Sequence, residues 1–268
     1  MERTRAALTA PGEPAGGPLL SAGARPLAVV IVAACVGTTA LLGALLGRGA
    51  HTDPVDTAVD SGVHASLAGH PKLLELLGRL GDLPAITGIT TVLVLVCLLR
   101  RRYRGAALVA ISIPAAALIT ERLLKPLVGR TALGFLSFPS GHATGTFALA
   151  IAITVLLAGA PRAVRLAAAV IAFAAASAVA AAMIALGFHY FTDAVAGAAV
   201  GTGTVLTAAL LLDLAVQAWR RPGQRPSAAV STEDRPGHAG AEGSAMGPAN
   251  AAKAAGPASS VRVSPNGD

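Results

Sequence analysis

Charged and aromatic residues are scarce in this chain. Of its 268 residues, 13% are charged and 3% are aromatic, whereas 54% are hydrophobic. Soluble globular proteins carry about a quarter of charged residues, and several apolar blocks here reach the roughly 20 residues that cross a bilayer. The composition therefore excludes an ordinary soluble enzyme, a disordered protein and a fibrous repeat, and it predicts a polytopic membrane protein.

Cysteine is almost absent, since the chain has only Cys35 and Cys97, and both lie inside apolar blocks. This excludes a disulfide framework and indicates two small buried hydrophobic side chains. The net charge of +7 comes from short basic clusters between apolar runs, without a basic face interleaved with aromatics. We therefore expect no nucleic-acid partner.

The apolar runs predict an all-α fold, a bundle of six transmembrane helices that fills a domain over residues 27–219. The spans are expected at about 27–47, 84–99, 105–124, 142–160, 166–188 and 194–218. Residues 1–26 and 220–268 are rich in Pro, Gly and Ala and are expected to be disordered tails. Between the first two spans, the leucines of residues 73–80 predict one short amphipathic helix.

The basic residues predict the orientation of these spans. With six crossings, one side of the membrane carries twelve bases and only two acids, Glu2 and Glu13. The distal part of the C-terminal tail is left out of this count. The bases are Arg3, Arg5, Arg25, Arg100, Arg101, Arg102, Arg104, Arg162, Arg165, Arg220, Arg221 and Arg225. By the positive-inside rule both termini are cytoplasmic, and the loops after spans one, three and five face outward.

Three polar segments converge on the outer side by this topology: 125–130, 139–142 and 189–193. Polar groups at membrane depth are costly unless they are used. Ser140 stands before an apolar helix as an N-cap, whose first-turn amides and dipole favour an anion, and Gly141 allows close approach of a phosphate. A plain capping turn is the alternative for this segment, and His142 in the same turn favours the anion site.

His189 and Asp193 are four residues apart and would share one face of a helix. A carboxylate on one ring nitrogen fixes the tautomer and leaves the other nitrogen as a nucleophile or base. The alternative is a histidine–aspartate pair at the membrane interface whose hydrogen-bonding groups only satisfy each other. Lys125 and Arg130 are cations suited to phosphate oxygens, although loop charges and headgroup anchors look the same in a sequence.

In this order, Lys-x4-Arg, Pro-Ser-Gly-His and His-x3-Asp on six spans, the chain resembles the type 2 phosphatidic acid phosphatase (PAP2) superfamily, over about residues 84–213. This family includes undecaprenyl-diphosphate phosphatases and vanadium haloperoxidases. The resemblance implies a phosphatase of the cell membrane that acts on a lipid phosphate or diphosphate, of the phosphatidate or polyprenyl type, with membrane lipids as its surroundings.

The resemblance also implies the roles of the residues. His189 would attack phosphorus to form a phosphohistidine, Asp193 would orient it, and His142 would protonate the leaving oxygen. The phosphoryl oxygens would be held by Lys125, Arg130, Ser140 and the Gly141 amide. No metal or other cofactor is implied, because cationic side chains take the part that Mg²⁺ has elsewhere.

The chain departs from the family pattern at two places. The first family motif is Lys-x6-Arg-Pro, and its last two positions are Ala132 and Leu133 here; the third motif usually opens with Ser-Arg, where this chain has Ala182 and Met183. Arg122, one helical turn before Lys125, is the candidate for compensation. A PAP2-like protein that binds lipid phosphates with weak or no catalysis is therefore the alternative function. A transporter is disfavoured because inverted repeats are absent.

Three other features have simpler interpretations. The histidines and aspartates of residues 51–70 match no metal-ligand spacing and indicate a solvated loop. Asp213 is expected to reach the interface or to pair with an arginine. Gly197 and Gly201 form a small-xxx-small pair typical of helix packing.

Overall fold

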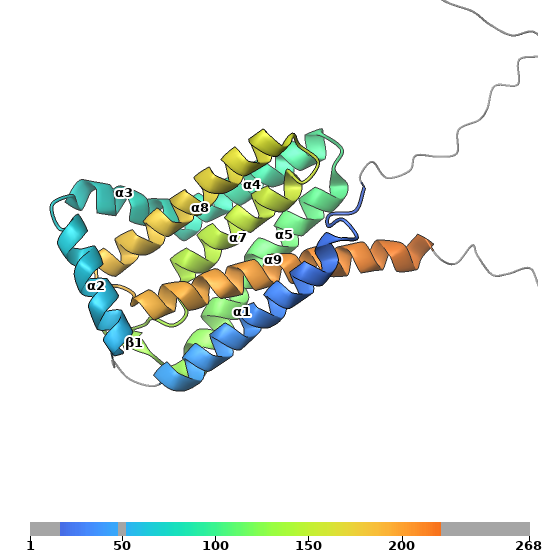
Figure 1. Ribbon diagram of the computed structural model, residues 1–268. Coiled ribbons are helices and arrows are strands. Elements are labelled where there is room, and N and C mark those ends of the chain that lie inside the picture. Colours follow the sequence, from blue (N-terminus) through green and yellow to red (C-terminus); the bar gives the residue numbers. More distant parts are fainter. Residues whose placement is uncertain (1–16, 48–51, 221–268) are drawn as a thin grey trace, which may run out of the picture. The chain divides into compact units, whose positions relative to one another are not determined.

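A computed structural model of the chain describes residues 17–47 and 52–220, which are largely helical (Figure 1). The long helices are α1 (Ala24–Leu46), α4 (Leu83–Leu99), α5 (Tyr103–Leu118), α7 (Gly141–Leu156), α8 (Arg162–Ala185) and α9 (Phe191–Arg220). The shorter elements are α2 (Pro54–Leu67), α3 (Pro71–Gly81), the π-helix η1 (Ile119–Leu124), α6 (Lys125–Val128), and the antiparallel strands β1 (Thr131–Ala132) and β2 (Phe135–Leu136). The tails expected at residues 1–16 and 221–268 lie outside the described residues.

The six expected spans coincide in position with the six long helices. By length and composition, four segments of the described chain can cross a membrane: α1, the continuous run from α5 through α6, α8, and α9. The pair α3 and α4, bent by 53°, passes the same test as a fifth span. α7 is apolar, but its 16 residues make it shorter than a typical span.

α7 lies between α5, α8 and α9, and its contact with α9 depends on glycine. A Cβ atom on Gly197 would lie 2.4 Å from the carbonyl oxygen of Ser140, and one on Gly201 would lie 2.4 Å from that of Thr144. No side chain fits at such distances, because the obstacle is backbone rather than a mobile side chain. The glycine pair therefore packs two helices together, the role that its spacing indicates.

The segment before α4 is more ordered than the sequence analysis predicts. It forms two helices, α2 and α3, where one short helix and a solvated loop are expected. The loop interpretation is wrong for α2, since Asp56 is fully buried. Asp53 accepts a hydrogen bond from the amide of Val55, with Pro54 in the first turn. This Asp-Pro start was a helix signal in the sequence, and the acidic residues that follow obscured it. His51 lies outside the described residues.

Residues 17–20, which fall in the tail expected over residues 1–26, are better ordered than a tail. Leu19 and Leu20 are buried, and their amides donate to the two carboxylate oxygens of Asp213 at 2.9 and 3.0 Å. Arg104 pairs with the same carboxylate, and Arg25 lies 3.5 Å from it. Asp213 therefore pairs with arginines, one of the two outcomes expected for it, and it also fastens residues 17–20 to α9.

The described chain begins and ends at the same end of the bundle, and α2 and α3 cover the opposite end (Figure 1). We call these the Asp213 end and the histidine end. Asp193 and Asp213 are 20 residues apart on α9, which is about 30 Å of helix and about the thickness of the hydrocarbon core of a bilayer. The polar residues of interest therefore lie at the two ends of an apolar bundle.

Candidate active site

The histidine end is organised around the first turn of α9. α8 ends at Ala185, and Gly187, with a φ of 77°, lets the chain turn away from the helix. The amide of Phe188 donates to the carbonyl of Met183, and that of Gly187 to the carbonyl of Ile184. These two bonds form a Schellman motif, which ends α8 four residues before His189.

Carboxylates accept the first three amides of the next helix. The amide of Tyr190 donates to Asp193 at 3.1 Å, that of Phe191 to Asp60 at 3.0 Å, and that of Thr192 to Asp56 at 2.8 Å. The amides at a helix start lack intrahelical partners, and the helix dipole favours negative charge there. Two of the three carboxylates come from α2, so α2 fixes the start of α9 and with it the position of His189.

Arg130 lies beneath this turn and joins the two buried carboxylates. Its side chain is fully buried, and its terminal nitrogens lie 2.7 Å from Asp193 and 2.6 Å from Asp56. It also donates to the hydroxyl of Thr192 at 2.7 Å and lies 4.2 Å above the ring of Tyr190. The motif spacing predicts that Arg130 holds phosphate. In the structure its terminal nitrogens contact the carboxylates of Asp193 in α9 and Asp56 in α2.

The two histidines of the motifs are brought together. The ring centroids of His142 and His189 are 6.2 Å apart in an edge-to-face arrangement. His189 is 8% exposed, and its Nδ1 lies 3.8 Å from Asp193, longer than a hydrogen bond. Asp193 therefore faces Nδ1 of His189, on the side of the ring away from Nε2.

His142 has a partner that the sequence analysis missed. Its Nε2 donates to Asp82, at 3.1 Å, in the link between α3 and α4. This carboxylate can stabilise a protonated imidazole. Asp82 follows the amphipathic stretch and precedes an apolar span, but nothing in the local sequence ties it to a histidine 60 residues away.

α7 begins beside these rings. Ser140 is its N-cap, accepting from the amide of Ala143 at 3.4 Å, and its own amide donates to the carbonyl of Asp193 at 3.0 Å. The N-cap prediction is confirmed. The first turns of α7 and α9 are therefore joined through backbone, which keeps His142 and His189 in register.

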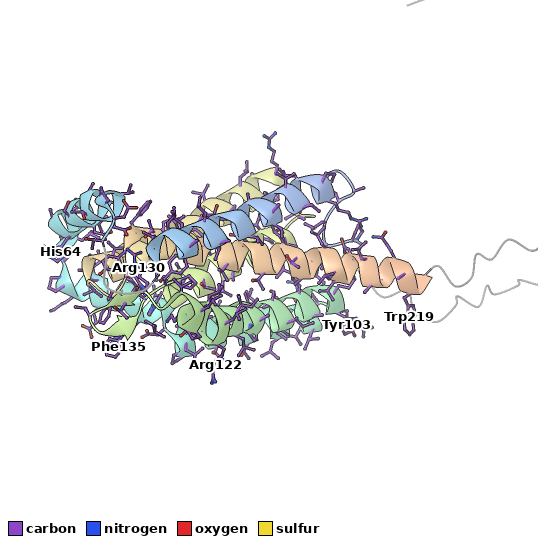
Figure 2. The ribbon with its side chains drawn as sticks, turned by 90° about the horizontal axis from the view of Figure 1, so that it is seen from below. His64, Tyr103, Arg122, Arg130, Phe135 and Trp219 are labelled. Carbon is purple, nitrogen blue, oxygen red and sulfur yellow. The ribbon has the colours of Figure 1, made fainter. Side chains whose placement is uncertain are left out.

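Lys125 lies close to Gly141, the first residue of α7. Its Nζ is 2.8 Å from Glu121, and a Cβ atom on Gly141 would lie 4.0 Å from that nitrogen. Arg122, expected as a compensating cation, is exposed and points outward from the bundle (Figure 2). The position where the family's third motif has an arginine supplies no cation either. It holds Met183, which is buried against α3 near Gly78.

A cavity of about 540 Å³ opens next to His189, between α2 and the end of α8. Its polar lining includes Asp60 and His64. Burial raises the pKa of Asp60 to about 6, and the nearby carboxylates of Asp56 and Asp193 add to the shift. This carboxyl group is therefore partly protonated near neutral pH, unlike an ordinary aspartate.

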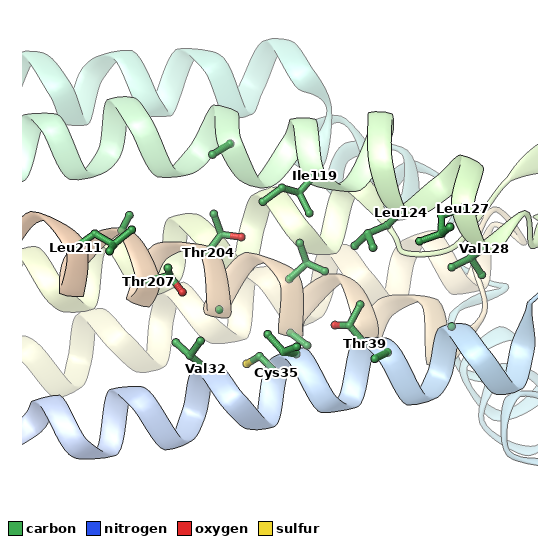
Figure 3. A pocket seen from close by; sticks show the side chains of 18 of the residues that line it. Val32, Cys35, Thr39, Ile119, Leu124, Leu127, Val128, Thr204, Thr207 and Leu211 are labelled. Carbon is green, nitrogen blue, oxygen red and sulfur yellow. The ribbon is translucent and has the colours of Figure 1, made fainter.

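A larger cavity of about 1140 Å³ runs along α1 and α9 below η1 and α6 (Figure 3). Its lining is apolar apart from a few groups such as Thr39 and Thr204, and it contains no charged residue. In the described residues, no cluster of His, Cys, Asp or Glu has the arrangement of a metal site.

The fold and the site together define a multi-pass membrane protein with a pair of histidines at one end of its helices. Residues 114–216, which contain all three polar segments, match the sequence model of the PAP2 superfamily. This region of the chain has the sequence pattern of that superfamily.

One solved structure has a similar fold. The crystal structure described as the first of a transmembrane PAP2-type phosphatidylglycerolphosphate phosphatase, from Bacillus subtilis, superposes with a TM-score of 0.53 at 18% sequence identity. The match covers 72% of this chain and 98% of that one. Among curated proteins, none matches this chain.

Proposed function

We propose that this protein is an integral membrane phosphatase that hydrolyses a lipid phosphate or diphosphate through a phosphohistidine. The observation that carries the proposal is the pair of imidazoles, 6.2 Å apart, beside the N-terminus of α7 and Lys125. One phosphoryl group between the rings can meet both of them. The family and the likeness to a membrane lipid phosphatase support the same class of reaction.

In this proposal Nε2 of His189 attacks phosphorus while the bond to the leaving oxygen breaks, and His142 donates a proton to that oxygen. Water then attacks the phosphohistidine, with His142 accepting its proton, and inorganic phosphate leaves. Lys125, Ser140 and the amide of Gly141 hold the phosphoryl oxygens, whose charge must be stabilised in the transition state.

Arg130 has an indirect part in this mechanism. Since its guanidinium is bonded to Asp193 and Asp56, it positions the carboxylate that faces His189 rather than touching the phosphate. Lys125 is then the main cationic side chain on the phosphoryl group. We expect slower turnover than in relatives with the complete motifs.

We further propose six crossings of the cell membrane with both termini cytoplasmic, so that the histidine end faces outward. The twelve bases on the other side support this orientation. The start and end of the described chain at the same end of the bundle support an even number of crossings.

The substrate is proposed to be a phosphatidate-type or polyprenyl-type lipid, because the histidines lie at the ends of apolar helices, at headgroup depth. The second candidate is a protein that binds lipid phosphates with little turnover. It is favoured by Ala132 and Met183 at the family's arginine positions and by the carboxylates that hold Arg130.

The test is phosphate release by purified protein in detergent from phosphatidate, phosphatidylglycerolphosphate and undecaprenyl diphosphate. His189→Ala should lower turnover by at least about 10³-fold. The control is His70→Ala, which changes an exposed histidine before α3 and should retain full activity. Turnover that survives His189→Ala would sink the phosphohistidine mechanism, and no release by the wild type would favour the binding protein.

A further inference from the structure

The carboxylate of Glu121 lies in front of the first turn of α7. Its Oε1 is 2.8 Å from Nζ of Lys125. The same oxygen would lie 2.6 Å from a Cβ atom on Gly141, so it rests directly against the Cα of that glycine. Glu121 therefore stands between the lysine and the backbone that the proposed mechanism assigns to the phosphate.

The local structure explains why the side chain of Glu121 lies beside Lys125 and how it can move away. Glu121 lies in η1, a π-helical turn, an irregularity that is common at functional sites. Lys125 follows one turn later and is 15% exposed, whereas the side chain of Glu121 is 48% exposed. The lysine is thus more enclosed by the bundle than the glutamate, whose side chain has room to move away from it.

We propose that Glu121 is an internal competitor of the phosphate, occupying the anion site when no phosphoryl group is bound. A carboxylate and a phosphate are both oxyanions, and both accept hydrogen bonds from an ammonium group. They cannot share the space against Gly141, so each phosphate that enters displaces Glu121 from Lys125. The inference rests on the phosphate site of the proposed function and adds a residue outside its three motif segments.

The competition affects the binding of inorganic phosphate and of a lipid phosphate differently. Inorganic phosphate has only its oxygens to offset the lost ion pair, and it should bind weakly and leave quickly. A lipid phosphate also gains from contacts of its chain with the bundle, and it can displace Glu121 at lower concentration. Glu121 therefore favours release of the product over retention.

The probe is inorganic phosphate, titrated by calorimetry into the detergent-solubilised full chain. Glu121→Gln keeps the size of the side chain and removes its charge, and Glu121→Ala removes the competitor. The matched control is Glu75→Gln, since Glu75 forms the same i,i+4 pair with Arg79, at 2.5 Å, on the exposed face of α3. The same proteins are assayed for hydrolysis of a lipid phosphate with inorganic phosphate as inhibitor.

Both Glu121 variants should bind inorganic phosphate about fivefold more tightly than the wild type, as expected for losing one half-exposed ion pair of about 1 kcal/mol. The inhibition constant of phosphate should fall by the same factor, and Glu75→Gln should change neither. The difference should shrink at high salt, because screening weakens exposed charges.

Equal or weaker phosphate binding by the Glu121 variants overturns the inference, since the glutamate would then only hold Lys125 in place. The absence of phosphate binding by every variant also overturns it. The proposed function is judged separately by lipid hydrolysis and its loss in His189→Ala. Tighter phosphate binding without any hydrolysis would support the competitor and reject the enzyme.

Discussion

α9 carries a buried carboxylate at each end of the bundle, and the two serve different purposes. Asp213 accepts two backbone amides and pairs with Arg104 and Arg25. Asp193 accepts one amide and pairs with Arg130, but it also faces a histidine at 3.8 Å. The same aspartate–arginine pairing therefore fastens a chain segment at the Asp213 end and lies beside the ring of His189 at the histidine end.

The comparison shows why a buried ion pair alone does not indicate a site. Both aspartates are at most 1% exposed. In the described part of the chain, the histidine end also has an imidazole pair, the Ser140-capped start of α7 and a cavity next to His189. The expected consequences of changing each end differ accordingly.

The largest contrast is expected between Asp193→Asn and Asp213→Asn. We expect Asp193→Asn to lower turnover by about 10³–10⁴-fold, because an amide cannot hold the required tautomer of His189. Asp213→Asn should leave the turnover of the folded protein unchanged but lower the free energy of unfolding by about 3 kcal/mol. Lipid hydrolysis and thermal unfolding in detergent measure the two effects, and equal loss of turnover in both variants would contradict the distinction.

A smaller effect is expected for Asp56, which supports the histidine end from α2. Asp56→Asn leaves Arg130 with one buried carboxylate fewer and should destabilise the protein by about 1.5–3 kcal/mol. Because Arg130 positions Asp193, we expect kcat to fall about tenfold with little change in KM.

The control for this variant is Asp53→Asn, three residues earlier on the same helix. Asp53 is the N-cap of α2, and asparagine caps about as well as aspartate. Stability and kcat should both be retained. If the two variants behaved alike, the network around Arg130 would have no special role.

The smallest effect concerns Asp60, which accepts the amide of Phe191 at the start of α9. Its pKa is raised from 3.8 to about 6 in the folded protein, so the folded state holds a proton that the unfolded state has already lost. Stability should therefore fall as the pH rises from about 4 to about 6.

Asp60→Asn should remove this dependence, because asparagine does not titrate and its oxygen can still accept from the amide of Phe191. Melting temperatures of the wild type and the variant, measured from pH 4 to 7, should diverge as the pH rises, with the variant more stable at pH 7. Parallel curves would show that Asp60 has an ordinary pKa.

Much of the architecture could be predicted because apolar length and period are local properties. The long helices lie where apolar runs occur, and Ser140 caps α7 as its neighbours indicate. The prediction was wrong for α2, where acidic residues suggested solvent although Asp56 is buried. The number of spans also stayed open, since α7 has only 16 residues and α4 passes the test only together with α3.

The motif spacing predicted which residues gather at the histidine end but not which residues contact them. The motif spacing named His142, His189, Asp193 and Lys125, which the fold gathers at one end. It did not reveal Asp82 or Glu121, because their contacts depend on how α3, η1 and α7 meet. It also assigned Arg130 to phosphate, whereas the structure gives this arginine to Asp56 and Asp193.

By itself, the sequence determined that the chain is a helical membrane protein with PAP2 motifs, since hydrophobic length and short motif spacings are written in neighbouring residues. The tertiary structure decided which charges neutralise one another. Charges pair across elements 60 to 188 residues apart in the chain, and only the packed helices bring such residues within the few ångströms over which a hydrogen bond acts.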